Sequence, residues 1–140
     1  MRLHRNVQAG VEYNPAAGDV APLATVFLLT ETERRPAAFL GTSSDRIGSP
    51  AGTQSYYLTV AKFAPLVRTG FYASLSWSEW DERFNFPFGA QVEFGRGVYV
   101  RPMYDGERSH GLAGAAFGRF NAAFVWAWFE KIGASLAIGF

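Results

Sequence analysis

The stretch from Asn121 to Phe140 constrains the fold most, because apolar and small residues alternate along it. Every second residue from Ile132 to Phe140 is apolar, and the residues between them are glycine, serine or alanine. A period of two places successive side chains on opposite faces of a β-strand. Just upstream, the run 123–128 alternates aromatic with small or aliphatic residues, and Glu130–Lys131 can turn the chain. The stretch therefore predicts a hairpin with one apolar face.

The same alternation recurs through the rest of the chain. Besides the closing hairpin, it predicts strands over 3–13, 37–43, 55–63, 70–78, 84–95, 98–103 and 112–118. The run 21–30 is apolar on both faces and predicts either a strand or a helix, although Thr25, Val26 and Phe27 disfavour a helix. We expect Pro87 near the end of its strand, because proline cannot donate to a ladder. The total is about ten strands, or about eight if 37–43 and 112–118 are loops.

Length and composition narrow the class of protein. A length of 140 residues indicates one domain, over 1–140. Aromatic residues make up 16% of the chain and there are 15 glycines, which suits a β-rich protein better than a helical one. The 13 basic and 12 acidic residues leave a net charge of +1, which argues against a nucleic-acid partner. The absence of cysteine excludes structural disulfides and thiolate metal sites.

The hydropathy pattern leaves one way for this chain to cross a bilayer. No apolar run approaches the length of about 18 residues that a membrane-spanning helix needs. The strongest window, Ala21 to Leu29, is short and contains Pro22 and Thr25. Only spanning β-strands remain, because hydrocarbon requires every backbone polar group to be paired within a closed sheet.

The closing strand has apolar residues on one face, small residues on the other, and an aromatic residue at its end. It resembles the last strand of bacterial outer-membrane β-barrel proteins, in which this strand is the signal that the barrel-assembly machinery reads. The resemblance implies an all-β fold: an antiparallel up-and-down transmembrane β-barrel of about 8–10 strands, or the C-terminal part of a larger barrel. It also implies that Leu136, Ile138 and Phe140 form the assembly signal, and that outer-membrane lipid and the assembly machinery are the partners.

In such a barrel the apolar rows face lipid and the small or polar rows face the lumen. Aromatic residues near strand ends are expected at the membrane interfaces: Tyr13, Trp77, Phe84, Phe86, Phe94, Trp126 and Trp128. Charged residues on the inward rows are expected to form a lumenal polar network: His4, Glu12, Glu93, Arg101 and Arg119. Such a network either fills a small barrel and makes it rigid or selects a polar solute.

The connections between the predicted strands differ in length in an ordered way. Longer loops at 44–53, 79–83 and 105–110 alternate with short turns at 33–36, 95–97 and 118–121. Outer-membrane barrels have this asymmetry, with long loops outside the cell and short turns in the periplasm. If the sheet does not close within one chain, its edge strands need a partner chain or missing strands.

The start of the chain conflicts with export. Residues 1–6 contain neither the apolar segment nor the small-residue cleavage site of a signal peptide. Three explanations stay open: an engineered methionine on a mature chain, a piece of a longer gene product, or a soluble protein that stays in the cytoplasm. Arg5 also interrupts the apolar row of the first strand, although arginine near a strand end costs a barrel only about 0–1 kcal/mol.

Motifs for chemistry are absent from the sequence. No nucleotide, zinc or nucleophile pattern occurs, and His4 and His110 belong to no metal-ligand spacing. We therefore expect no cofactor, no metal and no catalytic residue, and predict a non-enzymatic outer-membrane protein with an envelope-structural, surface-contact or small-solute passage role. One alternative is a soluble β-barrel or sandwich that binds a hydrophobic ligand in an aromatic-lined cavity. Another is an enzyme whose loop residues converge at the barrel mouth: Asp81, Asp105, Ser109 and His110.

Overall fold

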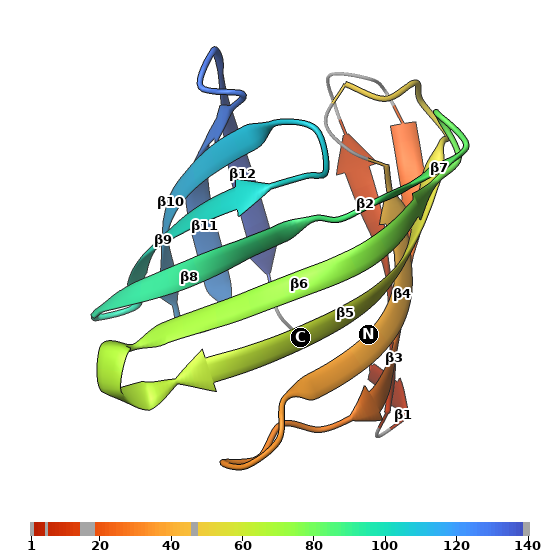
Figure 1. Ribbon diagram of the computed structural model, residues 1–140. Coiled ribbons are helices and arrows are strands. Elements are labelled where there is room, and N and C mark those ends of the chain that lie inside the picture. The colour runs from red at the N-terminus through yellow and green to blue at the C-terminus, as the bar shows by residue number, and fades with distance from the viewer. Residues whose placement is uncertain (1, 5, 15–18, 46–47, 139–140) are drawn as a thin grey trace. The chain divides into compact units, whose positions relative to one another are not determined.

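The computed structural model describes residues 2–4, 6–14, 19–45 and 48–138, and their side chains except those of 2–4, 13, 14, 19 and 137. Almost all of these residues belong to β-strands or to the turns between them (Figure 1). The helical segment that they contain, η1 (Pro65–Val67), is a single 3₁₀ turn. None of the described residues forms a helix with the length and apolar character needed to cross a membrane.

The strands form one sheet in which sequence neighbours are also sheet neighbours. They are β1 (Arg2–His4), β2 (Val7–Asn14), β3 (Asp19–Leu29), β4 (Ala37–Ser44), β5 (Gln54–Ala64), β6 (Thr69–Ser78), β7 (Arg83–Asn85), β8 (Phe88–Gly95), β9 (Val98–Tyr104), β10 (Ser109–Phe117), β11 (Phe120–Ala127) and β12 (Lys131–Ile138). The order is β1-β2-β3-β4-β5-β6-β8-β9-β10-β11-β12, with β7 paired to β6. This arrangement confirms the predicted all-β class and antiparallel up-and-down order. The sheet is not closed into the predicted barrel, because no ladder among the described residues joins its end strands β1 and β12. The sheet contains 12 strands among the described residues, more than the predicted 8–10.

The chain divides into two compact units, and each is described by itself. Unit 1 comprises residues 1–61 and 73–86, and unit 2 comprises residues 62–72 and 87–140. Strands β1 to β4, β7 and the larger parts of β5 and β6 belong to unit 1. Strands β8 to β12 and the turn η1 belong to unit 2.

The register of unit 1 separates its two faces. On one face Phe27 of β3 lies opposite Phe39 of β4, with ring centroids 5.6 Å apart, and Tyr57 of β5 meets Phe39 edge-on at 6.4 Å. On the other face Leu40 lies opposite Leu58. Alternate residues of each strand thus point to opposite sides, as the period of two in the sequence predicts.

The apolar run 21–30 is a strand and not the alternative helix. As β3 it pairs with β2 on one side and with β4 on the other. Ladders on both edges satisfy its backbone groups, so the run needs no helical hydrogen bonds despite being apolar on both faces. A register shift between Phe27 and Leu29 marks a bulge near its end.

Two predicted strands are divided in the structure. The run 84–95 was predicted as one strand, but β7 ends at Asn85 and β8 begins at Phe88. Pro87 lies in the interruption, where its missing N–H breaks no ladder. The run 3–13 also fails as one strand, because β1 folds back on β2 and places His4 opposite Val7. These two interruptions account for the higher strand count.

The centre of the turn between β11 and β12 lies two positions before the predicted Glu130–Lys131 turn. Trp128 and Phe129 have φ values of 55° and 56°, and the Glu130 N–H donates to the Ala127 carbonyl at 3.0 Å. Two central residues with positive φ are the pattern of a type I′ hairpin turn, which normally uses asparagine or glycine. The prediction of Trp128 in a strand row is therefore wrong. The left-handed conformation costs about 1–2 kcal/mol for each residue that carries a Cβ.

Gly41 provides a test of how closely the strands of unit 1 pack. A Cβ built on Gly41 would lie 2.5 Å from Cζ of Tyr57 and 2.7 Å from the Ala24 carbonyl oxygen. We expect Gly41→Ala to lower the free energy of unfolding by about 1–3 kcal/mol, because the tyrosine ring and a backbone carbonyl would have to move. Gly10→Ala is the matched control, since its Cβ would meet only Leu23 at 3.9 Å. Urea unfolding measures both, and equal losses would contradict this packing.

Candidate functional site

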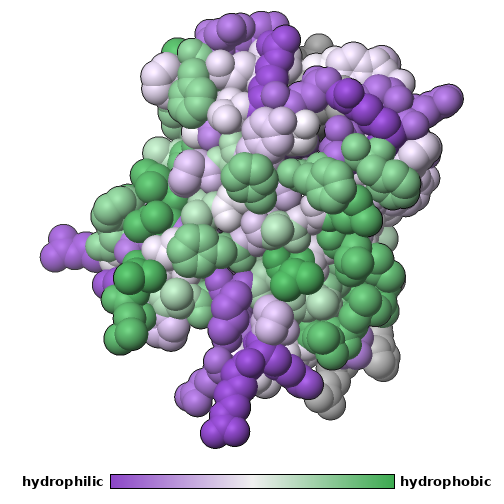
Figure 2. All heavy atoms as spheres, viewed as in Figure 1, coloured by the Kyte–Doolittle hydropathy of each residue, from purple (hydrophilic) through white to green (hydrophobic). Residues whose placement is uncertain are grey.

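Each unit has an exposed apolar face. Large apolar side chains at alternate strand positions are exposed: Val26, Leu28, Leu40, Leu58, Val60, Phe71, Leu75, Phe88, Phe94, Phe117, Phe120, Phe124, Trp126, Ile132, Leu136 and Ile138. Figure 2 shows apolar side chains covering much of the visible face between groups of hydrophilic ones. Apolar surface of this extent marks contact with a partner or with an apolar phase.

Small polar side chains occupy the opposite face. In unit 1 the hydroxyls of Ser55 and Ser76 lie 2.6 Å apart, and those of Thr59 and Ser74 lie 2.7 Å apart, so both pairs link β5 to β6. Among the described residues, the buried apolar ones are Ala21, Tyr99, Ala123 and Ala127. The buried polar ones are Ser55, Thr59, Thr69, Ser76, Ser78, Asn85 and His110. This distribution is the reverse of that in a water-soluble protein.

The predicted interface aromatics lie mainly on the exposed apolar face. Four of them are exposed: Phe84, Phe86, Phe94 and Trp126. Trp77 is half-buried because its ring meets that of Phe84 across β6 and β7, with centroids 5.0 Å apart. Trp128 stands in the β11–β12 turn, and the side chain of Tyr13 is outside the described ones.

Unit 2 contains a pocket of about 280 Å³. Its walls come from the end of η1, from β8 and β9 with their connecting turn, and from the ends of β10 and β11. The lining residues are Arg68, Gln91, Glu93, Gly95, Arg96, Gly97, Val98, Tyr99, Arg101, Ala116 and Asn121. Most of the strand residues in this set belong to the polar face. The pocket is therefore a hydrophilic cavity that carries three guanidinium groups and one carboxylate.

The structure brings together two members of the predicted lumenal network. Arg101 donates to Oε1 of Gln91, from Nε at 3.2 Å and also from a second guanidinium nitrogen, and Nε2 of Gln91 lies 3.4 Å from Oε1 of Glu93. A neutral amide thus connects the arginine to the carboxylate. Glu12 lies in unit 1 and accepts a hydrogen bond from Ser44 at 2.6 Å. Arg119 stands in the exposed β10–β11 turn outside the pocket lining, and the side chain of His4 is outside the described ones.

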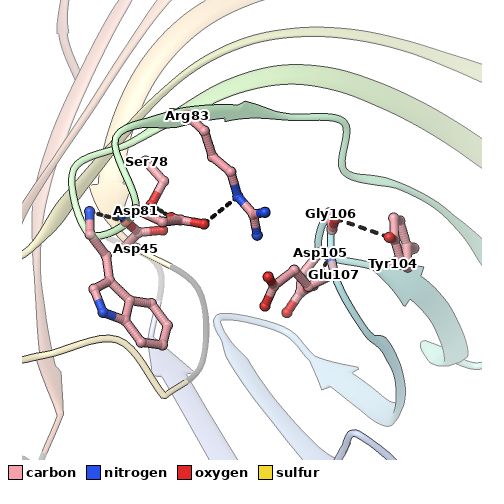
Figure 3. A network of polar contacts seen from close by, with 9 residues as sticks. Asp45, Ser78, Asp81, Arg83, Tyr104, Asp105, Gly106 and Glu107 are labelled. Carbon is pink, nitrogen blue, oxygen red and sulfur yellow. Dashed lines mark hydrogen bonds and ion pairs between the residues drawn. The ribbon is translucent and has the colours of Figure 1, made fainter.

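A hydrogen-bonded cluster holds the β6–β7 loop of unit 1 (Figure 3). Ser78 is 1% exposed, and its hydroxyl lies 2.5 Å from Oδ2 of Asp45 and 2.5 Å from Oδ1 of Asp81. The hydroxyl carries one hydrogen, so it donates to one carboxylate at a time. Asp81 also forms an ion pair with Arg83, and Asp45 accepts the backbone N–H of Trp80. The cluster joins the β4–β5 loop to the β6–β7 loop.

Glu79 adds a second anchor in the same loop. Its carboxylate accepts the backbone N–H of Gln54 at 2.9 Å and the hydroxyl of Tyr56 at 2.8 Å. The Gln54 N–H, followed by the Tyr56 hydroxyl, lowers the pKa of Glu79 because both stabilise the ionised carboxylate. The anchor is therefore fully formed at neutral pH.

A corresponding cluster lies at the β9–β10 loop of unit 2. Asp105 accepts the backbone N–H groups of Glu107 and Arg108, each at 2.8 Å, and its other oxygen lies 2.7 Å from Nε2 of His110. Burial raises the pKa of Asp105, but the two backbone hydrogen bonds and the His110 contact outweigh burial, so the pKa is lowered overall. The Tyr104 hydroxyl donates to the Gly106 carbonyl in the same loop (Figure 3).

His110 connects this loop to the β11–β12 turn. Its side chain is 2% exposed, and Nδ1 accepts the backbone N–H of Trp128 at 3.3 Å. The hydrogen-bond network therefore assigns the proton to Nε2, which donates to Asp105. Arg108 and Lys131 lie 4.8 and 5.1 Å from the Trp128 ring centroid, as cation–π contacts. These contacts stabilise the turn in its left-handed conformation.

The alternative of an enzyme requires loop residues that could act as catalytic groups, and the hydrogen bonds of Asp105, His110 and Asp81 bear on it. Asp105 and His110 form a hydrogen-bonded pair, but both imidazole nitrogens already have partners. A general base needs a free nitrogen within reach of the hydroxyl that it activates. Asp81 belongs to unit 1 and is engaged with Ser78 and Arg83. The geometry of the pair is that of a loop anchor.

Several pocket residues do not appear in the predicted site. Gln91 shares a strand row with Glu93, and Tyr99 shares one with Arg101, so the alternation alone places them beside the predicted network. The predicted set contained only residues that carry a charge at some pH, and so left out these neutral hydrogen-bonding groups. Arg68 stands in a turn, outside every strand period, and the sequence gives no signal for its position.

The predicted assembly signal lies on β12. Leu136 is 84% exposed, Ile138 is exposed beside it on the same face, and Phe140 is outside the described residues. No protein-family model matches the sequence, and comparisons with curated proteins and with solved structures found no match either.

The lowered pKa of Asp105 leads to a pH-dependent prediction. We expect Asp105→Asn to reduce the free energy of unfolding at pH 7 by about 1–2 kcal/mol, because a side chain that is 15% exposed loses charge-assisted hydrogen bonds. A depressed folded-state pKa stabilises the fold above the ordinary aspartate pKa of about 3.9, and this contribution is lost as the pH falls through the lower folded value. Urea unfolding at pH 7 and about pH 3 should show the difference shrinking in acid. A difference that grows in acid would contradict the anchor.

Proposed function

We propose that the chain is an integral β-sheet protein of the bacterial outer-membrane barrel class, with a non-enzymatic role in the envelope. The observation that carries the proposal is the reversed distribution of side chains. Leucine, isoleucine, valine and phenylalanine are exposed at alternate strand positions, while serine and threonine hydroxyls are buried on the other face. In a membrane barrel the outward row faces acyl chains and the inward row carries small and polar groups.

The exposed rows favour lipid over water as their surroundings. Apolar surface left in water costs about 25 cal/mol per Å², and a row of this kind occurs on nearly every strand. Charged residues are rare on these rows: the exposed face of β8 carries Phe88, Ala90, Val92 and Phe94, and that of β11 carries Phe120, Ala122, Phe124 and Trp126. A solvent-facing row would instead contain lysine and glutamate. Acyl chains supply the missing apolar contact.

The alternative, a soluble barrel with an aromatic-lined cavity, has less support. Such a protein would turn its phenylalanine residues toward the cavity. The pocket of unit 2 is lined by arginine, glutamate, glutamine and asparagine, with Tyr99 as its aromatic residue. Phe88, Phe94 and Phe124 are exposed on the opposite rows. This pocket is therefore not the aromatic-lined cavity that the alternative requires.

The role within the envelope follows from the polar face and from the loops. Paired hydroxyls such as Ser55–Ser76 make the inner face of unit 1 a fixed surface, which suits a structural role. Anchored loops such as 79–82 suit surface contact, and the unit 2 pocket suits a small polar solute. The exposed row of Leu136 and Ile138 on β12 would be read by the assembly machinery, and outer-membrane lipid would surround the apolar face.

Fractionation gives the direct test of the proposal. We expect the protein to enter the membrane or detergent fraction, and its folded form to migrate differently from the boiled form on a detergent gel, because a lipid-facing β-sheet keeps its fold in detergent until it is heated. Gel mobility with and without boiling measures this. A monomer that stays soluble at high concentration without detergent would overturn the proposal.

A pair of arginine substitutions tests whether the exposed apolar face contacts lipid or water. Leu58 is 40% exposed near the middle of β5, and Leu66 is 101% exposed in η1 at the end of a strand. In lipid vesicles we expect Leu58→Arg to cost about 2–4 kcal/mol and Leu66→Arg about 0–1 kcal/mol, because the cost of arginine rises toward the bilayer midplane. In a water-exposed sheet both changes stay within about 0.5 kcal/mol. Urea unfolding in vesicles distinguishes the two cases.

A further inference from the structure

We infer that the pocket of unit 2 binds a small solute carrying a phosphate group. Three arginines, Arg68, Arg96 and Arg101, line this pocket together with one carboxylate, that of Glu93. The formal charge of the lining is therefore +2. No described carboxylate forms an ion pair with any of the three arginines, so their charge remains available to an anion.

Arg101 is already oriented for a ligand. Gln91 accepts two of its N–H groups, and the guanidinium carbon lies 5.8 Å from the centre of the Tyr99 ring. Both partners are neutral, so they fix the guanidinium without cancelling its charge. A guanidinium held in this way can offer its remaining N–H groups to two oxygens of a phosphate. Less side-chain entropy is lost on binding, because the arginine is ordered beforehand.

Asn121 provides a neutral donor beside the arginines. Its Oδ1 accepts the Tyr99 hydroxyl at 2.8 Å, which leaves the amide nitrogen without a hydrogen-bond partner among the described residues. An amide nitrogen is a donor only, so the site adds a second kind of N–H group suited to an oxyanion. The pocket thus combines charged and neutral donors, with Glu93 as its sole described acid.

Two turns bring the other arginines to the pocket. Arg68 and Arg96 have φ values of 49° and 51°, a left-handed conformation that disfavours residues with a Cβ. The Arg68 carbonyl accepts the Glu93 N–H at 2.9 Å, and a Cβ on Gly95 would lie 3.7 Å from the Arg68 guanidinium. These contacts hold the η1 turn against the β8–β9 turn within unit 2. Glycine would adopt this left-handed backbone at lower cost than arginine. Arginine at both positions instead adds a positive charge to the pocket lining.

The size and position of the pocket define the ligand further. A volume of about 280 Å³ is near the lower limit for small-molecule sites, which favours a small solute. Gln91, Glu93 and Arg101 lie on the polar rows, opposite the exposed apolar row of Val92 and Phe94. A lipid held by its acyl chains at the apolar face would not present its headgroup here. The inference thus deepens the small-solute role and rests on the proposed function.

Titration calorimetry with inorganic phosphate tests the inference on the full chain. We expect saturable binding, weakened about tenfold or more by Arg101→Gln, because one charge-assisted pair is lost. Glu93→Gln should tighten binding about twofold or more by removing the acid. Arg119→Gln makes the same charge change outside the pocket and should leave binding unchanged. Circular dichroism confirms that each variant folds.

Several results would count against phosphate binding in the pocket or against the proposed function. Absence of phosphate binding, or equal weakening by Arg101→Gln and Arg119→Gln, would overturn the inference. Binding only to phosphatidic acid in mixed micelles would overturn it as well, because the ligand would then be a lipid headgroup. Each preparation is also fractionated with and without detergent. A protein that enters the detergent fraction without binding phosphate refutes this inference alone, whereas a protein soluble without detergent refutes the proposed function.

Discussion

The backbone ladder between sequence-adjacent strands is the constraint on which the rest of the structure depends. Strands such as β3, β4, β10 and β11 pair on both edges, so their peptide groups are satisfied within the sheet. Once these groups are paired, the sheet needs no water along its strands, and the two rows of side chains determine which surroundings suit each face. Apolar groups are therefore free to point outward.

The face opposite the exposed apolar rows combines the ring contacts of Phe27, Phe39 and Tyr57 with short hydrogen bonds between hydroxyls. Serine and threonine are small enough to let neighbouring strands approach, and pairing hydroxyl with hydroxyl removes the cost of burying each one. Gly41 and Gly114 extend this pattern, because the rings of Tyr57 and Tyr99 lie directly over them. A larger residue at either glycine would displace a tyrosine that takes part in the hydrogen-bond network of its unit.

The sequence predicts the fold well wherever the alternation of apolar and polar side chains determines where the strands lie. Alternation identifies strands and assigns their two faces. It does not decide the run of β3, which is apolar on both faces and was predicted as either a strand or a helix, with Thr25, Val26 and Phe27 disfavouring the helix. It fails where backbone chemistry overrides the period of two. At Pro87 the predicted strand 84–95 is interrupted, and at Trp128 the chain adopts a left-handed turn that normally uses glycine or asparagine. The pocket is partly predictable, because Glu93 and Arg101 both belong to the predicted polar network and both line it. Gln91, which connects them, carries no charge, and Arg68 comes from a turn whose position depends on tertiary packing.

The loops of the two units are ordered by the same chemical device. Asp45 accepts the backbone N–H of Trp80, and Asp105 accepts those of Glu107 and Arg108. Each aspartate also contacts a buried polar side chain, Ser78 or His110. An ionised carboxylate can accept several hydrogen bonds at once, so one aspartate fixes a whole loop without an apolar core beneath it. A sheet whose large apolar residues lie mostly on the exposed face has little such core to offer. Carboxylate anchoring is therefore a direct consequence of the reversed side-chain distribution, and it supplies the fixed loop surface that an envelope-contact role would use.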